Sequence, residues 1–269
     1  MNSLENKYSP DWKNRYSRQI AVPGVGESGQ RHIAGARVLV IGAGGLGIPI
    51  VQYLASAGVG RLGIADDDVV SLSNLQRQPV YREFDVGRKK TEGIARMARA
   101  LNSSMVLDVH DIRVSESNIR SLVADYDIVA DATDNFASRY GINDACVLEN
   151  KPMVYGSVFR YEGQVAVFNV QNGKGEFGPN FRDLFPKPPP HELVPDPGQS
   201  GVISALPGII GSIQAMEMIK WIIGTGGLLD GRMLLFDGAE MSTRTITIPD
   251  TGARHDIHSV RFTDTTDTV

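Results

Sequence analysis

The chain has 269 residues but only one cysteine, Cys146, and it contains no long apolar run. A single thiol cannot form an internal disulfide or a zinc site made of several cysteines. A membrane-spanning helix needs roughly 18 consecutive apolar residues, and no run in this sequence approaches that length. The first 15 residues are polar and charged, unlike a signal peptide. We therefore expect a cytoplasmic protein with no membrane partner.

The chain also lacks an excess of positive charge. It has 27 Lys and Arg residues against 31 Asp and Glu residues, so its formal net charge is −4. Because phosphate backbones attract basic surfaces, this balance argues against a general nucleic-acid partner. With 42% hydrophobic residues the chain can bury a sizeable core. Glycine is unusually frequent, with 29 residues, and the positions of these glycines are informative.

Apolar runs alternate with helix-like segments through the first 157 residues. The stretch 36–47 begins with β-branched residues and ends in glycines, which is typical of a buried parallel strand entering a tight turn. Further strands are predicted at 61–65, 105–109, 127–132 and 153–157, and helices at 48–57, 89–101, 116–123 and 136–149. This alternation predicts an α/β fold with a Rossmann-like, doubly wound, mostly parallel sheet.

The pattern changes after residue 157. Residues 158–170 alternate between polar and apolar, which indicates an antiparallel hairpin, and 232–236 with 243–248 indicate a second pair. We expect these antiparallel strands to continue the same sheet in the C-terminal third, with a long apolar helix at 209–223 packed on it. The Gly- and Pro-rich stretch 171–202 is interpreted as a loop crossing the active face, with a poorly ordered insertion as the alternative.

A glycine motif predicts a nucleotide site. Gly42, Gly44 and Gly47, with Gly45 between them, form G-x-G-x-x-G between a predicted strand and a predicted helix. Backbone N–H groups and the helix dipole can bind phosphate there. Asp66, about 20 residues later at the end of the next strand, is placed to bond a ribose hydroxyl. At this point an NAD(P)-dependent oxidoreductase fits equally well.

Polar residues after the second strand favour ATP over NAD. The string 71–78 reads SLSNLQRQ and places Asn74 and Arg77 over the same end of the sheet, where Lys90 adds a second cation. Two fixed positive charges suit a triphosphate. Asp134 and Asn135 follow the strand 127–132, at the edge of the sheet where Mg²⁺ can bind with phosphates. Individually these residues also fit as surface charges or a helix cap, so only their joint occurrence favours ATP.

Taken together, these motifs resemble those of the ubiquitin-activating-enzyme-like adenylyltransferases, and more narrowly the bacterial ThiF/MoeB family, which activates sulfur-carrier proteins for thiamine and molybdopterin synthesis. The similarity runs from about residue 12 to about residue 248. It rests on RYSRQI at 15–20, the glycine turn at 42–47, SLSNLQRQ at 71–78, Lys90, DATDN at 131–135 and GQV at 163–165.

The resemblance implies a homodimer that binds Mg²⁺ and ATP and adenylates the C-terminal glycine of a small ubiquitin-like sulfur carrier ending in Gly-Gly, releasing pyrophosphate. By motif, Asp66 resembles the ribose-binding acid and Asp134 the magnesium-associated carboxylate. Arg18 resembles the arginine that reaches into the neighbouring subunit's site. The phosphate contacts would be Asn74, Arg77 and Lys90, so the catalytic set is Arg18, Arg77, Lys90 and Asp134.

The sequence departs from the family in its cysteines. Most bacterial members hold a structural zinc with two Cys-x-x-Cys pairs, whose positions here read NFRD at 180–183 and HDIH at 255–258. We expect no structural zinc, although Asp183, His255 and His258 offer three ligands of acceptable type. Pro197 occupies the place of the family's loop cysteine. The acyl-adenylate is therefore expected to pass directly to an external sulfur donor, a persulfide source. Cys146, on a helix with apolar spacing, is interpreted as a core residue.

We divide the chain into an N-terminal helical arm (1–34), an ATP-binding Rossmann-like half (35–157), an antiparallel and crossover-loop half of the same domain (158–250) and a polar tail (251–269). Three alternatives to carrier adenylation stay open. The enzyme could adenylate another peptide or carboxylate in a specialised pathway, it could be an NAD(P)-dependent oxidoreductase, or the chain could be a catalytically silent binding partner.

Overall fold

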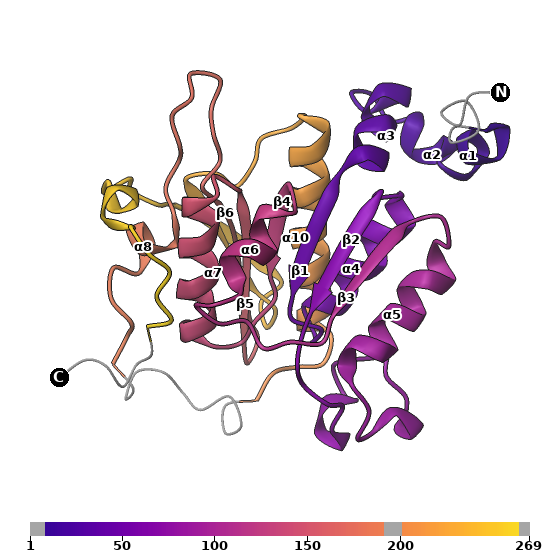
Figure 1. Cartoon of the computed structure of the whole chain (residues 1–269), viewed down its shortest axis with the longest axis horizontal. Helices are drawn as coiled ribbons and strands as arrows, with labels where there is room; N and C mark the ends of the chain where they lie inside the picture. The colour runs from indigo at the N-terminus through magenta and orange to yellow at the C-terminus, as the bar shows by residue number, and fades with distance from the viewer. Residues whose placement is uncertain (1–8, 191–200, 264–269) are drawn as a thin grey trace.

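A computed structural model describes residues 9–190 and 201–263. Its centre is an eight-stranded sheet with the order β3-β2-β1-β4-β5-β6-β7-β8 (Figure 1). The strands are β1 (Arg37–Ile41), β2 (Arg61–Ala65), β3 (Val106–His110), β4 (Ile128–Asp131), β5 (Met153–Phe159), β6 (Glu162–Phe168), β7 (Arg232–Asp237) and β8 (Ser242–Thr247). The first five are parallel, and the last three are antiparallel to their neighbours. The predicted fold class is confirmed.

Helices cover both faces of the sheet. They are α1 (Pro10–Arg15), α2 (Ser17–Ile20), α3 (Gly26–Gly35), α4 (Gly47–Ala57), α5 (Lys90–Leu101), α6 (Ile119–Ala124), α7 (Phe136–Leu148), α8 (Phe181–Leu184) and α10 (Leu206–Ile223). One core cluster joins the sheet to α4, α5 and α10, and a second joins it to α6, α7 and α8. Both faces of β1 are therefore buried, which explains its unbroken apolar run. Among the described residues, no helix combines the length and apolar character of a membrane span.

The first predicted hairpin was expected within residues 158–170. The observed hairpin begins earlier, because its first strand is β5, which starts at Met153. Strand β5 continues to Phe159, and it pairs antiparallel with β6 along its whole length. The chain reverses at Arg160, whose φ of 52° is unusual for a residue other than glycine. Alternation shows which residues share a face but does not locate the reversal. The second predicted pair is confirmed as β7 and β8.

The two described parts of the segment between β6 and α10 lie on opposite faces of the sheet (Figure 1). Its first part includes α8, which packs with α7, and its last part leads into α10 on the opposite face. At the described end, Arg160 donates its backbone N–H to the Gly201 carbonyl and accepts from Ile203. Because Arg160 follows β5, residues 201–203 lie at the carboxyl edge of the parallel strands. The middle of the predicted loop, with Pro197, lies outside the described residues.

Residues 251–263 of the expected polar tail pack against the body of the protein. Ile257 is buried, and Phe262 lies directly against Gly141 of α7. The guanidinium of Arg254 stacks on Phe177 at 3.7 Å and donates to Asn169. Apolar residues in a largely polar segment thus fasten it to the second core cluster.

Candidate functional site

The glycine motif forms a tight turn at the carboxyl end of β1. Gly42 has a φ of +105°, and its N–H donates to the Ala65 carbonyl at 2.8 Å. A Cβ on Gly47, the first residue of α4, would overlap the Gly42 carbonyl oxygen. Only glycine fits a turn this close. The turn therefore presents the first backbone N–H groups of α4 at the edge where phosphates bind in such sheets.

Asp66 lies beside this turn and helps to hold it. Its two carboxylate oxygens accept the backbone N–H of Ala43 at 2.7 Å and that of Asp68 at 2.8 Å. Burial raises the pKa of Asp66, and these two N–H groups oppose the rise. A carboxylate has about four lone-pair sites, so the predicted ribose contact remains available to Asp66. The structure also gives Asp66 a second role that was not predicted from the sequence: it stabilises the glycine turn through its hydrogen bond with the Ala43 N–H.

Lys90 is joined to the same group of residues. Its side chain is 8% exposed and pairs with Asp68 at 2.6 Å. Tyr81, which the sequence analysis missed, donates its hydroxyl proton to the Ala43 carbonyl at 2.6 Å and lies 3.2 Å from the Lys90 carbonyl. Burial raises the pKa of Tyr81 well above its usual value, so the hydroxyl stays a donor. This single side chain therefore links the glycine turn to the start of α5.

The string 71–78 packs against the glycine turn. The carbonyl of Arg77 would lie 3.4 Å from a Cβ on Gly45. The Asn74 side chain accepts the Ser71 N–H at 3.1 Å, and the Arg77 guanidinium donates to the Ser73 carbonyl at 2.9 Å. The loop that carries both predicted phosphate contacts thus packs on the glycine turn through the Arg77 backbone, and both side chains stabilise that loop.

The loop after β4 lies directly beside Gly42. A Cβ on Gly42 would be 3.3 Å from the Thr133 nitrogen. Asp134 is exposed, and among the described residues it has no hydrogen-bond or ion-pair partner. The cap of α7 is Asn135, whose amide oxygen accepts the Ser138 N–H at 2.9 Å. Asn135 therefore takes the helix-cap role that was the alternative for Asp134. The Asp134 carboxylate remains available to a ligand.

Arg18 is the predicted site residue that this chain does not bring to the glycine turn. It is exposed on α2, which the preceding Tyr16 and the following Gln19 attach to the Gly58 turn. Gly58 precedes β2, at the amino edge of the sheet, whereas the glycine motif follows β1 at the carboxyl edge. A strand of five residues spans about 16 Å. Arg18 therefore lies across the sheet from the other predicted site residues.

Two buried charges near Asp134, Asp131 of the DATDN motif and Arg139, were not predicted to form a pair. Asp131 is fully buried, and Arg139, one turn into α7, has a side chain that is 7% exposed. Burial raises the pKa of Asp131, and the nearby Arg139 opposes the rise. Apolar periodicity cannot reveal such a pair, because a charged residue in a helix reads as an exposed one.

The three possible metal ligands of the C-terminal segment do not converge. Within residues 9–190 and 201–263, the acidic or His side chains that meet within 4.8 Å in a group of three are Asp66, Asp67 and Asp68. Asp183 instead accepts from Thr251 at 2.8 Å and Asn180 at 2.8 Å through backbone N–H groups. Its carboxylate therefore fastens α8 to the C-terminal segment through hydrogen bonds.

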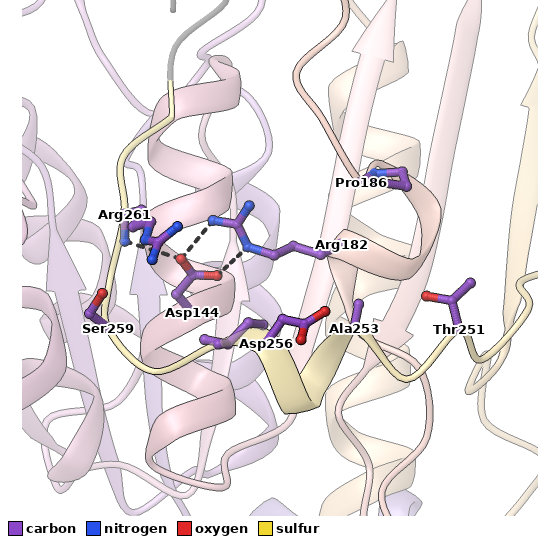
Figure 2. A pocket seen from close by; sticks show the side chains of 9 residues that line it. Asp144, Arg182, Pro186, Thr251, Ala253, Asp256, Ser259 and Arg261 are labelled. Atoms are coloured by element: carbon purple, nitrogen blue, oxygen red, sulfur yellow. Dashed lines mark hydrogen bonds and ion pairs between the residues drawn. The ribbon is translucent and has the colours of Figure 1, made fainter.

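A cavity of about 290 Å³ lies close to this junction (Figure 2). Figure 2 shows Asp144 of α7 facing Arg182, and the two form a bidentate pair with both distances 2.7 Å. Asp144 also accepts the backbone N–H of Arg261 at 3.1 Å. Of the two acids and two arginines that line the cavity, Asp144 and Arg182 already pair with each other. It lies on the α7 and α8 side, away from the glycine turn.

Cys146 is fully buried in α7, as predicted. Burial raises the pKa of its thiol far above the usual value, so the reactive thiolate is not formed at neutral pH. Cys146 is a core residue of the second cluster.

Comparisons with known proteins identify the family of this chain. The model of the ThiF family matches residues 16–255, so the chain belongs to the ThiF family. It is 43% identical over 242 residues to the sulfur carrier protein adenylyltransferase of Thermus thermophilus, covering 90% of this chain and 89% of that protein. It is 44% identical to the SAMP-activating enzyme E1 of Haloferax volcanii, covering 87% and 84%.

Other relatives are longer than this chain. The probable adenylyltransferase/sulfurtransferase MoeZ of Mycobacterium tuberculosis is 47% identical over 234 residues, which cover 87% of this chain and 59% of MoeZ. Among solved structures, Escherichia coli MccB with the peptide MccA-N7isoASN has a TM-score of 0.74 at 20% identity, covering 91% of this chain and 74% of that one. The structural likeness supports the fold, and the sequence relatives confirm the family that the motifs indicated.

Proposed function

We propose that this protein is an ATP-dependent adenylyltransferase that activates the C-terminal glycine carboxylate of a small ubiquitin-like sulfur-carrier protein. The observation behind this proposal is the arrangement at the carboxyl edge. Asp66 and the Asp134 loop lie directly against the glycine turn, and Lys90 is joined to them through Asp68 and Tyr81. The named relatives are adenylyltransferases and activating enzymes, in agreement with the predicted class of enzyme.

The charges of the site suit this reaction. The attacking carboxylate and the pyrophosphate leaving group are both anionic, so the protein must offset negative charge while holding the reactants in line. Lys90, paired with Asp68, supplies one cation at this edge, and Arg77 supplies a second from the loop that packs on the glycine turn. The N–H groups at the start of α4 face the same edge. Lys90 would exchange its contact with Asp68 for one with phosphate. No protein nucleophile is needed, in keeping with the buried Cys146.

Asp134 is the residue that we propose for magnesium. Hard cations prefer carboxylate oxygens and usually keep phosphate and water as their other ligands. The exposed Asp134 carboxylate, unpartnered among the described residues and close to Gly42, fits that chemistry. When bound, Mg²⁺ would neutralise charge on the phosphates. Asn135 extends the same loop, but its amide oxygen is engaged in capping α7.

The rest of the predicted assembly stays a proposal. Arg18 can serve a site only in a second copy of the chain, because it lies across the sheet from its own glycine turn; we therefore propose a homodimer. We propose that the segment 171–202 covers the carrier's C-terminal tail, since its described end lies on Arg160 at the carboxyl edge. An external persulfide donor would receive the acyl group, and the cytoplasm is the compartment that we propose.

The experiment that tests the function is exchange of labelled pyrophosphate into ATP with Mg²⁺ and candidate carriers that end in Gly-Gly. We expect exchange that depends on one carrier and disappears when its last glycine is deleted. Asp134→Asn is the matched variant: it removes the charge with little change of shape and should lower exchange by about 100-fold. ATP binding without exchange for any carrier would favour another carboxylate substrate, and absence of ATP binding would refute the proposal.

A further inference from the structure

Two buried charges lie beneath the loop that carries Asp134. The Nε atom of Arg139 is 3.9 Å from Oδ2 of Asp131, and the two side chains are 7% and 0% exposed. At that separation the atoms do not form a hydrogen bond, and neither has another partner among the described residues. Buried polar atoms without partners are rare in folded proteins and require an explanation.

Both charges act on the same residue, Thr133. The Oδ1 atom of Asp131 accepts the Thr133 N–H at 3.0 Å and the Thr133 hydroxyl at 2.6 Å. The Nη2 atom of Arg139 donates to the Thr133 carbonyl at 3.1 Å. All three polar groups of the residue before Asp134 are thus fixed. Asp134 itself has no side-chain partner in the described parts of the chain, so its position is set through Thr133.

The pair is anchored to three separate elements. Arg139 also donates to the Ser157 hydroxyl on β5 at 3.2 Å, and its guanidinium lies 5.2 Å from the centre of the Tyr155 ring. Gln214 of α10 donates to the Asp131 carbonyl at 2.9 Å and to the Val154 carbonyl at 3.2 Å. The loop after β4 is therefore connected to β5, α7 and α10.

We propose that Arg139, acting with Asp131, is a positioning residue that orients the Asp134 carboxylate for its magnesium ion; this inference rests on the proposed function. A buried ion pair often stabilises a fold no better than apolar residues of similar volume. A pair that holds every polar atom of Thr133 instead orients the next residue, as outer partners orient metal ligands. The planar guanidinium of arginine suits this task because its Nη2 atom, fixed in the plane of the group, donates to the Thr133 carbonyl and to the Ser157 hydroxyl.

Three variants separate positioning from general stability. Thr133→Val keeps the shape of the side chain and removes only the hydroxyl contact with Asp131. Arg139→Lys keeps the charge and removes the planar guanidinium whose Nη2 atom donates to Thr133. Ser157→Ala is the matched control, since it removes the other contact of the same Nη2 atom and leaves the contacts with Thr133 intact.

The first measurement uses the ligand-free protein. Amide hydrogen exchange at residues 133–135 should rise by about 10-fold in Thr133→Val and in Arg139→Lys. Ser157→Ala should change exchange there by less than about 2-fold. This readout requires neither magnesium nor activity, so it tests the positioning even if the proposed function fails.

The second measurement is pyrophosphate exchange across a range of Mg²⁺ concentrations. The Mg²⁺ concentration for half-maximal exchange should rise by about 10-fold in both loop variants, whereas ATP binding without Mg²⁺ stays within about 2-fold. An inactive wild-type protein would refute the proposed function alone. The positioning role would be overturned by a different result with an active wild-type protein. In that result, Thr133→Val and Arg139→Lys would match Ser157→Ala both in their Mg²⁺ dependence and in their amide exchange. Should Arg139→Lys fail to fold, Thr133→Val decides whether the Asp131 contact with Thr133 positions the Asp134 loop.

Discussion

Glycine is required at position 47 for a steric reason that does not apply at position 44. A Cβ on Gly47 would overlap the Gly42 carbonyl oxygen, which is part of the same turn and cannot move away. A Cβ on Gly44 would meet only the Gln78 side-chain amide at 3.6 Å, an ordinary contact. Gly44 and Gly47 both belong to the motif, yet only Gly47 is sterically closed to a larger residue.

We therefore expect Gly47→Ala to lower the free energy of unfolding by about 3 kcal/mol and to weaken ATP binding strongly, because the turn must open. Gly44→Ala should fold within about 1 kcal/mol of the wild type. Urea unfolding followed by fluorescence, together with titration of ATP, measures both effects. Equal destabilisation by the two substitutions would contradict this account of the turn.

A salt bridge at the other edge of the sheet gives a pH-dependent contribution to stability. Asp127 accepts the Arg37 backbone N–H at 2.9 Å and also pairs with the Arg37 guanidinium, which joins the start of β1 to the residue before β4. Burial alone would raise the pKa of Asp127, but the hydrogen bonds from Arg37 outweigh burial and hold that pKa below its ordinary value.

Asp127→Asn should lower the free energy of unfolding at pH 7 by about 1 kcal/mol, a modest loss because both side chains are partly exposed. A carboxylate with a lowered pKa in the folded state stabilises above its ordinary pKa of about 3.9, and this stability is lost as the pH falls through the folded-state pKa. The gap between variant and wild type should therefore shrink below about pH 4. Urea unfolding at pH 7 and at about pH 3.5 measures it, and a constant gap would contradict the assignment.

At the scale of elements, burial decided what the sequence could predict. The strand at 61–65 was predicted with its observed bounds because a run buried on both faces is apolar throughout. The position of the turn at Arg160 was not predicted, because a residue other than glycine takes positive φ there. The long helix begins at Leu206, three residues earlier than predicted, since Pro207 is tolerated in a first helical turn.

The same reasoning separates the predicted from the unpredicted site residues. The glycine turn, Asp66 and Lys90 follow recognisable motifs. The structure places Asp66 against the turn and joins Lys90 to it through Asp68. The Asp131 and Arg139 pair is invisible to such patterns, because the partners are eight residues apart and their burial depends on α10 and β5. The assignment of each residue's role in catalysis stays a prediction.

The junction between α8 and the C-terminal segment depends on one carboxylate. Asp183 is 5% exposed and accepts hydrogen bonds from the backbone of Asn180 on one side and from Thr251 and Ala253 on the other. Its oxygens are therefore engaged in hydrogen bonds, whereas His255 and His258 are exposed.

We expect Asp183→Ala to lower the free energy of unfolding by about 3 kcal/mol, because buried N–H groups on both segments lose their acceptor. Dialysis against a chelator should leave the unfolding temperature of the wild type unchanged. Differential scanning calorimetry measures both, with the double variant His255→Ala, His258→Ala as the control that should unfold like the wild type. A fall in unfolding temperature with chelator, or in the double variant, would indicate a metal at this junction.

At the scale of the whole molecule, the position of α2 decides how Arg18 can act. Gln19, next to Arg18, donates to Gln30 at 2.6 Å and to the Ala57 carbonyl at 3.1 Å, which fixes α2 against α3 and the end of α4. Figure 1 shows α1, α2 and α3 together at one end of the molecule. An arm held in this way cannot fold back across the sheet to its own glycine turn. A contribution of Arg18 to adenylation therefore requires a second chain.

Two inactive variants should consequently restore activity when they are combined. In the proposed homodimer, Arg18→Ala lacks the arginine that is donated to the neighbour, and Lys90→Met lacks a phosphate contact in its own site. After unfolding and refolding of an equal mixture, half of the dimers pair one variant with the other, and each of these contains one intact site of two. We expect about a quarter of wild-type pyrophosphate exchange, against near-background rates for each variant refolded alone. No recovery in a mixture that is dimeric by size-exclusion chromatography would show that Arg18 does not act across subunits.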